Sequence, residues 1–348
     1  MSPSGLIGLA IVSRPIANPP NPWATEHVEW LGDPPPAELS VYEEEARSIL
    51  SENDSPDLPF RWSLNPYRGC YHGCSYCYAR STHEYLGWGA GTDFERRIVA
   101  KTNAPDLLRR RFEKSSWRGE RIAFSGVTDC YQPVEASYGL TRACLQICCD
   151  YRNPVVVLTK GALIRRDVDL LVQLSRQSHA MVYLSIPFAT EKGAHAMEPW
   201  ASPIAARFDA LRTLSEAGVT TGVSLAPLIP GLNDSDVPEI LERARDCGAQ
   251  HAFQILLRLQ GPVESVFKER LQAVLPDRAQ KVHSALDDMR RGQSSRTQFG
   301  DRMVGGGSRW KAAADLFDVH CRRLGLGNRE VEGRHVESFC RPGDLFPS

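Results

Sequence analysis

Three cysteines lie close together in one short stretch of the sequence, RGCYHGCSYCYAR, which spans residues 68–80. Cys70, Cys74 and Cys77 have the spacing C-x3-C-x2-C. Thiolates are soft ligands that suit zinc and iron–sulfur clusters. In a reducing compartment, close cysteine spacing indicates metal binding or catalysis rather than disulfide formation. The stretch therefore predicts a metal centre.

The number of thiols favours a cluster over a zinc ion. A structural zinc needs a closed tetrahedral shell, usually built from two separated ligand pairs. The sequence has one C-x2-C pair, Cys74 and Cys77, and no H-x3-5-H pair, while His72 lies too near the cysteines to close a shell easily. A [4Fe–4S] cluster held by three thiolates keeps one iron open for a substrate or cosubstrate. We favour the cluster, with zinc as the alternative.

Apolar runs rich in β-branched residues alternate with helix-like segments from residue 59 onward. Continuous apolar runs are typical of parallel strands that are buried on both faces. The predicted strands are residues 60–66, 121–126, 154–160, 180–188, 220–230 and 251–259. The predicted intervening helices are residues 103–116, 137–151, 166–178, 202–217 and 234–247.

These β–α units predict an α/β fold with a parallel sheet and right-handed crossovers. Six units are too few for a complete eight-unit barrel, so we expect a partial (β/α)6 TIM-like barrel. A flat doubly wound sheet is the alternative. Both folds bind ligands at the carboxyl ends of their strands. The cysteine loop follows the first strand and should lie at that edge.

The chain divides into three predicted parts. Residues 1–58 are rich in proline and acidic residues and predict an irregular arm with one short helix near residues 41–51. Residues 59–260 form the β/α core. Residues 261–348 predict a helical C-terminal extension, with helices at 264–274, 276–291 and 309–324.

Composition limits the class of protein. The chain is 42% hydrophobic and 24% charged, which is ordinary for a soluble globular protein. Its formal net charge of −1 indicates no polyanionic partner by itself, although a local basic groove stays open. We find no secretory signal and no apolar run of about 18 residues that would cross a membrane. We therefore expect a cytoplasmic protein with no membrane contact.

The cysteine motif, with the aromatic Tyr76 before its last cysteine and a strand before it, resembles the radical S-adenosylmethionine (SAM) superfamily. The resemblance implies that SAM chelates the open iron of a [4Fe–4S] cluster. Reductive cleavage of SAM then gives methionine and a 5′-deoxyadenosyl radical, which abstracts hydrogen from the substrate. It also implies an electron donor such as flavodoxin or ferredoxin.

Four longer stretches resemble the branch related to spore photoproduct lyase, often called DNA repair photolyase, over roughly residues 50–325. They are NDSPDLPFRWSLNPYRGCYHGCSYCYAR, SGVTDCYQPVE, LTKGALIRRDVDLL and LAPLIPGLND. This resemblance implies a nucleic acid as one candidate substrate, for lyase-like repair or modification. A radical enzyme acting on a protein or small metabolite is the alternative. A non-catalytic zinc or iron–sulfur binding protein is the alternative from another class.

The resemblance also implies which residues contact SAM. The segment that ends the second strand would grip the amino group, because an ammonium needs carboxylate, hydroxyl and carbonyl acceptors. Lys160 would pair with the carboxylate as a point charge. Ser185 would bond the ribose or methionine part, the backbone of Ala226 would meet adenine, and Tyr76 lies in the adenine neighbourhood. The gripping segment contains Ser125, Gly126, Thr128 and Asp129. Each position is also an ordinary strand end, where a cap, a turn or a solvated lysine is expected.

Photoproduct lyases use a cysteine near the second strand as a hydrogen donor to the product radical. By the motif match, that cysteine corresponds to Gly126 in this sequence, and Cys130 lies four residues later. Cys130 is therefore our candidate catalytic hydrogen donor, and a buried neutral thiol is the alternative. The displaced position counts against lyase activity.

Two other features have plain structural explanations. Cys144, Cys148 and Cys149 could supply an auxiliary cluster, but cysteines on one helix face are more often core residues. The basic stretches at 107–121 and 164–167 could hold a nucleic acid backbone and stack a base on a tryptophan. The alternative for them is a solvated helix face.

Overall fold

A seven-stranded sheet forms the centre of the computed structural model, which describes residues 38–290, 304–327 and 338–343. Its strand order is β10-β9-β8-β7-β6-β3-β2. Six strands are parallel, namely β3 (Trp62–Leu64), β6 (Ile122–Phe124), β7 (Val155–Thr159), β8 (Ala180–Ser185), β9 (Thr220–Leu228) and β10 (His251–Leu256). The edge strand β2 (Leu50–Glu52) pairs with β3 in the antiparallel direction.

The six predicted strands are confirmed, each lying inside its expected range. The parallel strands follow one another across the sheet in chain order. A doubly wound sheet would reverse its strand order at a switch point, and the described strands contain no such reversal. The fold is therefore a mixed α/β fold with a mostly parallel sheet that winds in one direction.

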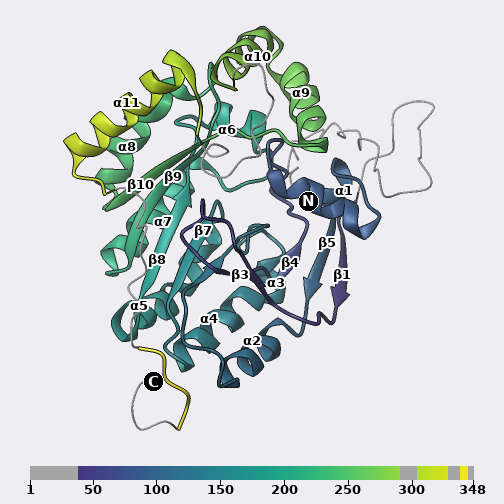
Figure 1. Ribbon diagram of the computed structural model, residues 1–348, viewed down its shortest axis with the longest axis vertical. Helices are drawn as coiled ribbons and strands as arrows, with labels where there is room; N and C mark the ends of the chain where they lie inside the picture. The colour runs from purple at the N-terminus through teal and green to yellow at the C-terminus, as the bar shows by residue number, and fades with distance from the viewer. Residues whose placement is uncertain (1–37, 291–303, 328–337, 344–348) are drawn as a thin grey trace, which may run out of the picture.

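Helices cover one face of this sheet (Figure 1). They are α4 (Leu140–Asp150), α5 (Val168–Gln177), α7 (Ile204–Glu216) and α8 (Val237–Asp246), which follow β6, β7, β8 and β9. Every second strand residue points toward them, because side chains alternate between the two faces. The main hydrophobic core on this side includes Val155, Val157, Val182, Leu184 and Val223.

The opposite face of the sheet carries the other half of each strand. A smaller apolar cluster there contains Met181, Tyr183 and Phe253, with Val156 and Leu158 packed against it. Lys160 and Ser185 continue the same alternation beyond or at the carboxyl ends of β7 and β8. Polar residues therefore lie at the carboxyl edge of this face, next to the smaller apolar cluster.

A second, three-stranded sheet was not predicted. It has the order β1-β5-β4 and consists of β1 (Ser40–Glu44), β5 (Arg97–Lys101) and β4 (Tyr67–Arg68). The short helix expected near residues 41–51 is wrong, because β1 and β2 occupy that region. Pairing of β1 with β5, more than 50 residues away, overrides the local acidic sequence YEEEA. Residues 1–37 of the expected arm lie outside the described residues.

The remaining helices lie in the connections between strands, and one of them, α2 (Ala104–Glu113), packs beside α4. They are η1 (Tyr78–Leu86), α1 (Thr92–Arg96), α2 (Ala104–Glu113), α3 (Glu135–Tyr138), η2 (Ala162–Asp167), α6 (Glu191–Met197) and η3 (Asp234–Asp236). The three helices predicted after residue 261 are present as α9 (Pro262–Val274), α10 (Pro276–Arg290) and α11 (Gly307–Leu324), which lie at the top of Figure 1. None of the helices in the described ranges is long and apolar enough to span a bilayer.

His83 in η1 predicts an acid sensitivity of folding. Burial lowers the pKa of His83 from 6.5 to about 4, while its Nε2 contacts the carbonyl of Arg97 at 2.9 Å. Below pH 6.5 the unfolded chain binds this proton before the folded chain does, so folding stability must fall with falling pH down to about 4. We expect this one group to remove roughly 1.4 kcal/mol per pH unit in that window.

Denaturant titrations of the metal-free protein between pH 7 and 4 would measure this slope. His83→Gln keeps a side-chain N–H donor for Arg97 but does not titrate, so its slope should be smaller. Equal slopes for the two proteins would contradict the assignment.

Candidate functional site

The cysteine loop begins directly after β4 and ends where Cys77 caps η1. Backbone bonds from Gly73 N to Cys70 O and from Cys77 N to Cys74 O, each 3.2 Å long, fold it into consecutive turns. Cys70 and Cys74 are buried, Cys77 is half-buried, and none of the three forms a disulfide. The loop thus holds three free thiols on one compact turn of chain.

The surroundings of these thiols keep them protonated when no metal is bound. Burial raises the pKa of Cys74 to about 12, although the Lys160 ammonium nearby partly offsets this effect. Burial also raises the pKa of Cys70 well above its usual range, and the Asp129 carboxylate adds to that shift. A metal that binds here must displace these protons, so its affinity should increase with pH.

Asp129 links the cysteine loop to the carboxyl end of β7. Its carboxylate accepts hydrogen bonds from Thr159 Oγ1 at 2.6 Å and from the backbone N–H of Lys160 at 2.7 Å. His72 Nδ1 lies 3.3 Å from Asp129 Oδ2. Burial opposes ionisation of Asp129, but His72 and these hydrogen bonds outweigh it, so the pKa of Asp129 lies below its usual value. Its predicted contact with the SAM amino group stays a prediction.

Four of the predicted cofactor residues come together at the ends of β7, β8 and β9. Lys160 Nζ donates to Ser185 Oγ at 2.9 Å and lies 5.6 Å from the centre of the Tyr76 ring. Ser185 Oγ in turn lies 3.4 Å from the carbonyl oxygen of Ala226. A cation, a hydroxyl, a carbonyl and an aromatic ring therefore border one corner of the carboxyl edge.

The segment after β6 forms the neighbouring part of the site. Asn65 Oδ1 accepts hydrogen bonds from the backbone of Val127 and Thr128, both at 3.1 Å. Tyr78, just after the last cysteine, donates to the carbonyl of Gly126 at 2.5 Å. Ser125 has a φ of 71°, a left-handed conformation that is strained for a non-glycine residue and is found often at functional sites.

Cys130 lies fully buried behind this segment. Its backbone N–H donates to Ser125 Oγ at 2.9 Å, and its side chain belongs to the main hydrophobic core. Burial raises the pKa of its thiol well above the usual range. These observations favour the core-thiol alternative, and hydrogen donation by Cys130 stays a prediction.

The cysteines of α4 are core residues, as the helix spacing predicted. Cys144, Cys148 and Cys149 are all buried in the main core, and burial raises the pKa of each thiol. Their neighbours in the main core are apolar side chains.

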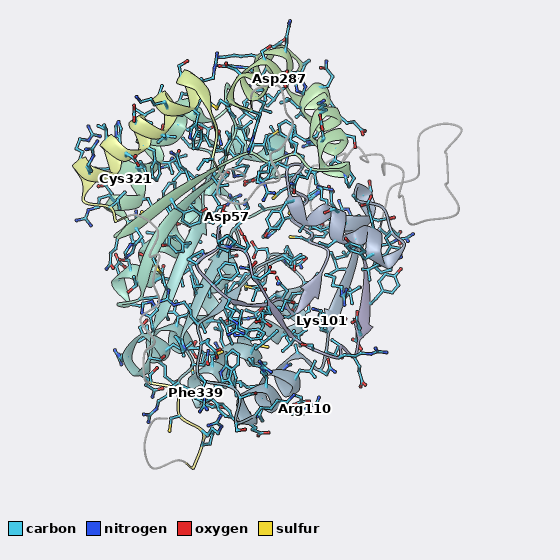
Figure 2. All side chains as sticks on the ribbon, viewed as in Figure 1. Asp57, Lys101, Arg110, Asp287, Cys321 and Phe339 are labelled. Carbon is cyan, nitrogen blue, oxygen red and sulfur yellow. The ribbon has the colours of Figure 1, made fainter. Side chains whose placement is uncertain are left out.

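Two residues of the basic stretches make contacts within the protein that count against the nucleic acid hypothesis. Trp117 is buried, and its Nε1–H donates to Asn153 Oδ1 at 2.9 Å, so its ring cannot stack an exposed base. Arg166 pairs with Glu135 at 2.6 Å and with Asp167 at 2.7 Å. Figure 2 shows Arg110, a residue of α2, at the lower end of the molecule, whereas α1, which follows the cysteine loop in the chain, lies in the upper half of Figure 1.

Sequence reasoning missed two buried ion pairs beside the cysteine loop. Arg80 Nη2 lies 2.5 Å from Glu95 Oε1, and Arg207 Nη2 lies 2.6 Å from Glu198 Oε2. All four residues are buried. No local pattern marks them, because charged residues are usually exposed and burial follows from tertiary packing. The proximity of Arg80 to Cys77 was the one available signal.

Gly126 predicts a measurable steric effect at the position matched to the lyase cysteine. A Cβ atom there would lie 2.7 Å from Ser63 Cβ and 3.0 Å from Ser63 Oγ. We expect Gly126→Cys to reduce the free energy of unfolding by about 1–3 kcal/mol, as overpacking usually does. Adding Ser63→Gly should restore part of that loss in urea titrations. An equally stable Gly126→Cys variant would contradict the close packing.

Comparisons with known sequences identify the family. A profile of the radical SAM superfamily matches residues 64–244, about half of the chain. The Mycobacterium tuberculosis (strain ATCC 25618 / H37Rv) protein Rv2578c is 33% identical over 232 residues, covering 66% of this chain and 68% of that protein. A protein of Pseudomonas phage M6 named radical SAM Nalpha-GlyT isomerase is 25% identical over 191 residues, covering 54% of this chain and 38% of that protein.

Solved structures show the same fold. Spore photoproduct lyase complexed with dinucleoside spore photoproduct matches with a TM-score of 0.58 at 16% identity, over 83% of this chain and 81% of that chain. A double mutant of that lyase with bound AdoMet and the dinucleoside matches with a TM-score of 0.59, the same identity and the same coverage. The cysteine spacing, the sheet and the sequence match agree, and the chain is an enzyme that belongs to the radical SAM superfamily.

Proposed function

We propose that this enzyme cleaves SAM reductively and uses the resulting radical to abstract hydrogen from its substrate. The observation that carries the proposal is the position of the cysteine loop. Three free thiols lie beside Lys160, Ser185 and Tyr76, at the edge where parallel strands present their carboxyl ends. A metal centre and a binding site for a charged small molecule thus adjoin each other.

The residues fit a [4Fe–4S] cluster held by Cys70, Cys74 and Cys77. Soft thiolates are the ligands that such clusters use. Among the described residues, no three His, Cys, Asp or Glu side chains converge on a single-ion position. A cluster attaches its thiolates to separate irons, so it is compatible with this arrangement. When bound, the cluster supplies the electron that splits SAM into methionine and a 5′-deoxyadenosyl radical.

The protein's own residues would hold SAM against the open iron. Lys160 supplies a positive charge for the SAM carboxylate, and Ser185 supplies a hydroxyl for the ribose or methionine part. The carbonyl and backbone of Ala226 and the neighbourhood of Tyr76 would border the adenine. Ser125, Gly126, Thr128 and Asp129 would take the amino group, and Cys130 is kept as the candidate hydrogen donor.

The proposed architecture around this site is a partial (β/α)6 barrel over residues 59–260. The one-way strand order supports it. Residues 1–58 and 261–348 would flank this core. A cytoplasmic location, with flavodoxin or ferredoxin as electron donor, would suit the free thiols.

For the substrate, we propose a nucleic acid that undergoes lyase-like repair or another modification. Support comes from the fold shared with a lyase solved with a dinucleoside photoproduct. A protein or small metabolite is the alternative. The glycine at position 126 counts against photoproduct cleavage in particular, and the buried Trp117 is not available to stack a base.

Anaerobic reduction of the reconstituted enzyme with SAM tests the chemistry, with 5′-deoxyadenosine as the measured product. Binding to single- and double-stranded DNA and RNA at rising salt tests the substrate class. A nucleic acid substrate predicts affinity that falls steeply with salt concentration. Absence of 5′-deoxyadenosine with a fully loaded cluster and every candidate substrate would contradict the radical chemistry and favour a non-catalytic metal-binding protein.

A further inference from the structure

Glu198 is a buried carboxylate that joins α6 and α7 to the corner of the site bordered by Lys160, Ser185, Ala226 and Tyr76. It caps the C-terminus of α6, and its side chain is fully buried. Its Oε2 atom lies 2.6 Å from Arg207 Nη2 on α7. Its Oε1 atom accepts a hydrogen bond from the Tyr76 hydroxyl and lies 3.9 Å from Lys160 Nζ. The two oxygens of one carboxylate therefore serve different partners.

The Arg207 guanidinium pairs with only one oxygen of Glu198. Arg207 Nε donates to the carbonyl of Ser202 at 2.7 Å, and Nη1 donates to the carbonyl of Ser185 at 3.0 Å. Arg207 and Glu198 neutralise each other at the bottom of the corner. A carboxylate that only neutralised Arg207 would not need to reach Tyr76 and Lys160 as well.

The other oxygen of Glu198 faces two residues that border the site. Lys160 lies between Glu198 Oε1 and Ser185 Oγ, with its ammonium 5.6 Å from the centre of the Tyr76 ring. The Lys160 side chain is 14% exposed, whereas the Glu198 side chain is fully buried. Of this pair, Lys160 is therefore the residue that faces the open end of the site. Counting Glu198 as −1 and Arg207 and Lys160 as +1 each leaves one positive charge at this open end.

We propose that Glu198 is a positioning residue that aims the Lys160 ammonium at the carboxylate end of SAM. Fixed partners reduce the number of orientations that a long lysine side chain explores, so less entropy is lost when the anion binds. The proposal rests on the proposed function, because it assigns a role in binding SAM. It makes Glu198 act through Lys160 rather than by touching the cofactor.

The test measures the dissociation constant of SAM for the cluster-loaded protein by equilibrium dialysis. Glu198→Gln keeps an acceptor for Tyr76 and removes the charge, and we expect it to weaken SAM binding about 10-fold, the low end of the range for residues that orient a ligand. Lys160→Met should weaken binding at least as much. Because Glu198 acts through Lys160, the double variant Glu198→Gln/Lys160→Met should bind no more weakly than Lys160→Met alone.

A second double variant separates positioning from folding. Glu198→Gln leaves Arg207 buried without its counter-charge and reduces stability. Glu198→Gln/Arg207→Gln removes both charges and should regain thermal stability and iron content, yet keep the weak SAM binding. Wild-type affinity in this variant, or additive losses with Lys160→Met, would overturn the proposal. Failure of the wild-type protein to load iron or bind SAM would instead reject the proposed function.

Discussion

The Cys77→Ala variant is expected to lose most of its iron after anaerobic reconstitution, whereas the wild-type protein should hold about four irons per chain. The remaining two cysteines of the loop are too few to hold a cluster that already lacks a fourth thiolate. Because SAM would bind the open iron, formation of 5′-deoxyadenosine should fall to background as well. Iron and sulfide analysis with product chromatography measures both losses.

Cys340→Ala is the matched control for this experiment. Cys340 follows Phe339, which Figure 2 labels at the lower end of the molecule, and it lies outside the cysteine loop. Its replacement should leave the iron content unchanged. Zinc in the wild-type protein, or equal iron contents in the Cys77 and Cys340 variants, would contradict a cluster on the predicted loop.

Arg80→Met is expected to cause the largest loss of stability near the site. Arg80 is fully buried and donates to the carbonyls of Gly73 and Cys74 in the cysteine loop, each at 2.9 Å. Arg80 also donates to the carbonyls of Ala90 and Gly91 in the loop after η1, and it pairs with Glu95 at 2.5 Å. Its removal leaves a buried carboxylate without a counter-charge, which costs about 3–5 kcal/mol.

Urea unfolding of the metal-free protein measures this loss. Arg80→Met/Glu95→Gln should regain part of the stability, because the stranded charge is gone. Arg309→Met is the exposed control, since Arg309 and Asp288 are 3.3 Å apart but half-exposed, and such pairs contribute less than about 1 kcal/mol. Equal losses in the Arg80 and Arg309 variants would show that Arg80 does not stabilise the cysteine loop.

Much of the fold could be predicted because its strands are buried on both faces. The run VVVLT of β7 and the run AMVYLS of β8 leave almost no ambiguity about burial. The small sheet could not be predicted, because β4 has two residues and β1 carries two glutamates. Its strands form through pairing across the chain, which composition does not encode.

Likewise, part of the candidate site could be predicted from the sequence and part of it could not. The meeting of Lys160, Ser185 and Ala226 follows from the rule that parallel strands present their carboxyl ends at one edge. Glu198 and Arg207 lie at a helix end and inside a helix, where nothing in the local sequence distinguishes a buried charge from a solvated one. Their burial depends on the contact of α6 with the cysteine loop and on the Glu198–Arg207 pair between α6 and α7, which follow from tertiary packing.

The most direct test of the central claim is electron paramagnetic resonance of the dithionite-reduced, reconstituted protein, recorded with and without SAM. The account predicts the signal of a reduced [4Fe–4S] cluster whose spectrum changes when SAM is added, because SAM would occupy the iron that Cys70, Cys74 and Cys77 would leave open. A cluster signal that SAM does not alter, or a protein that binds zinc and gives no signal, would contradict it.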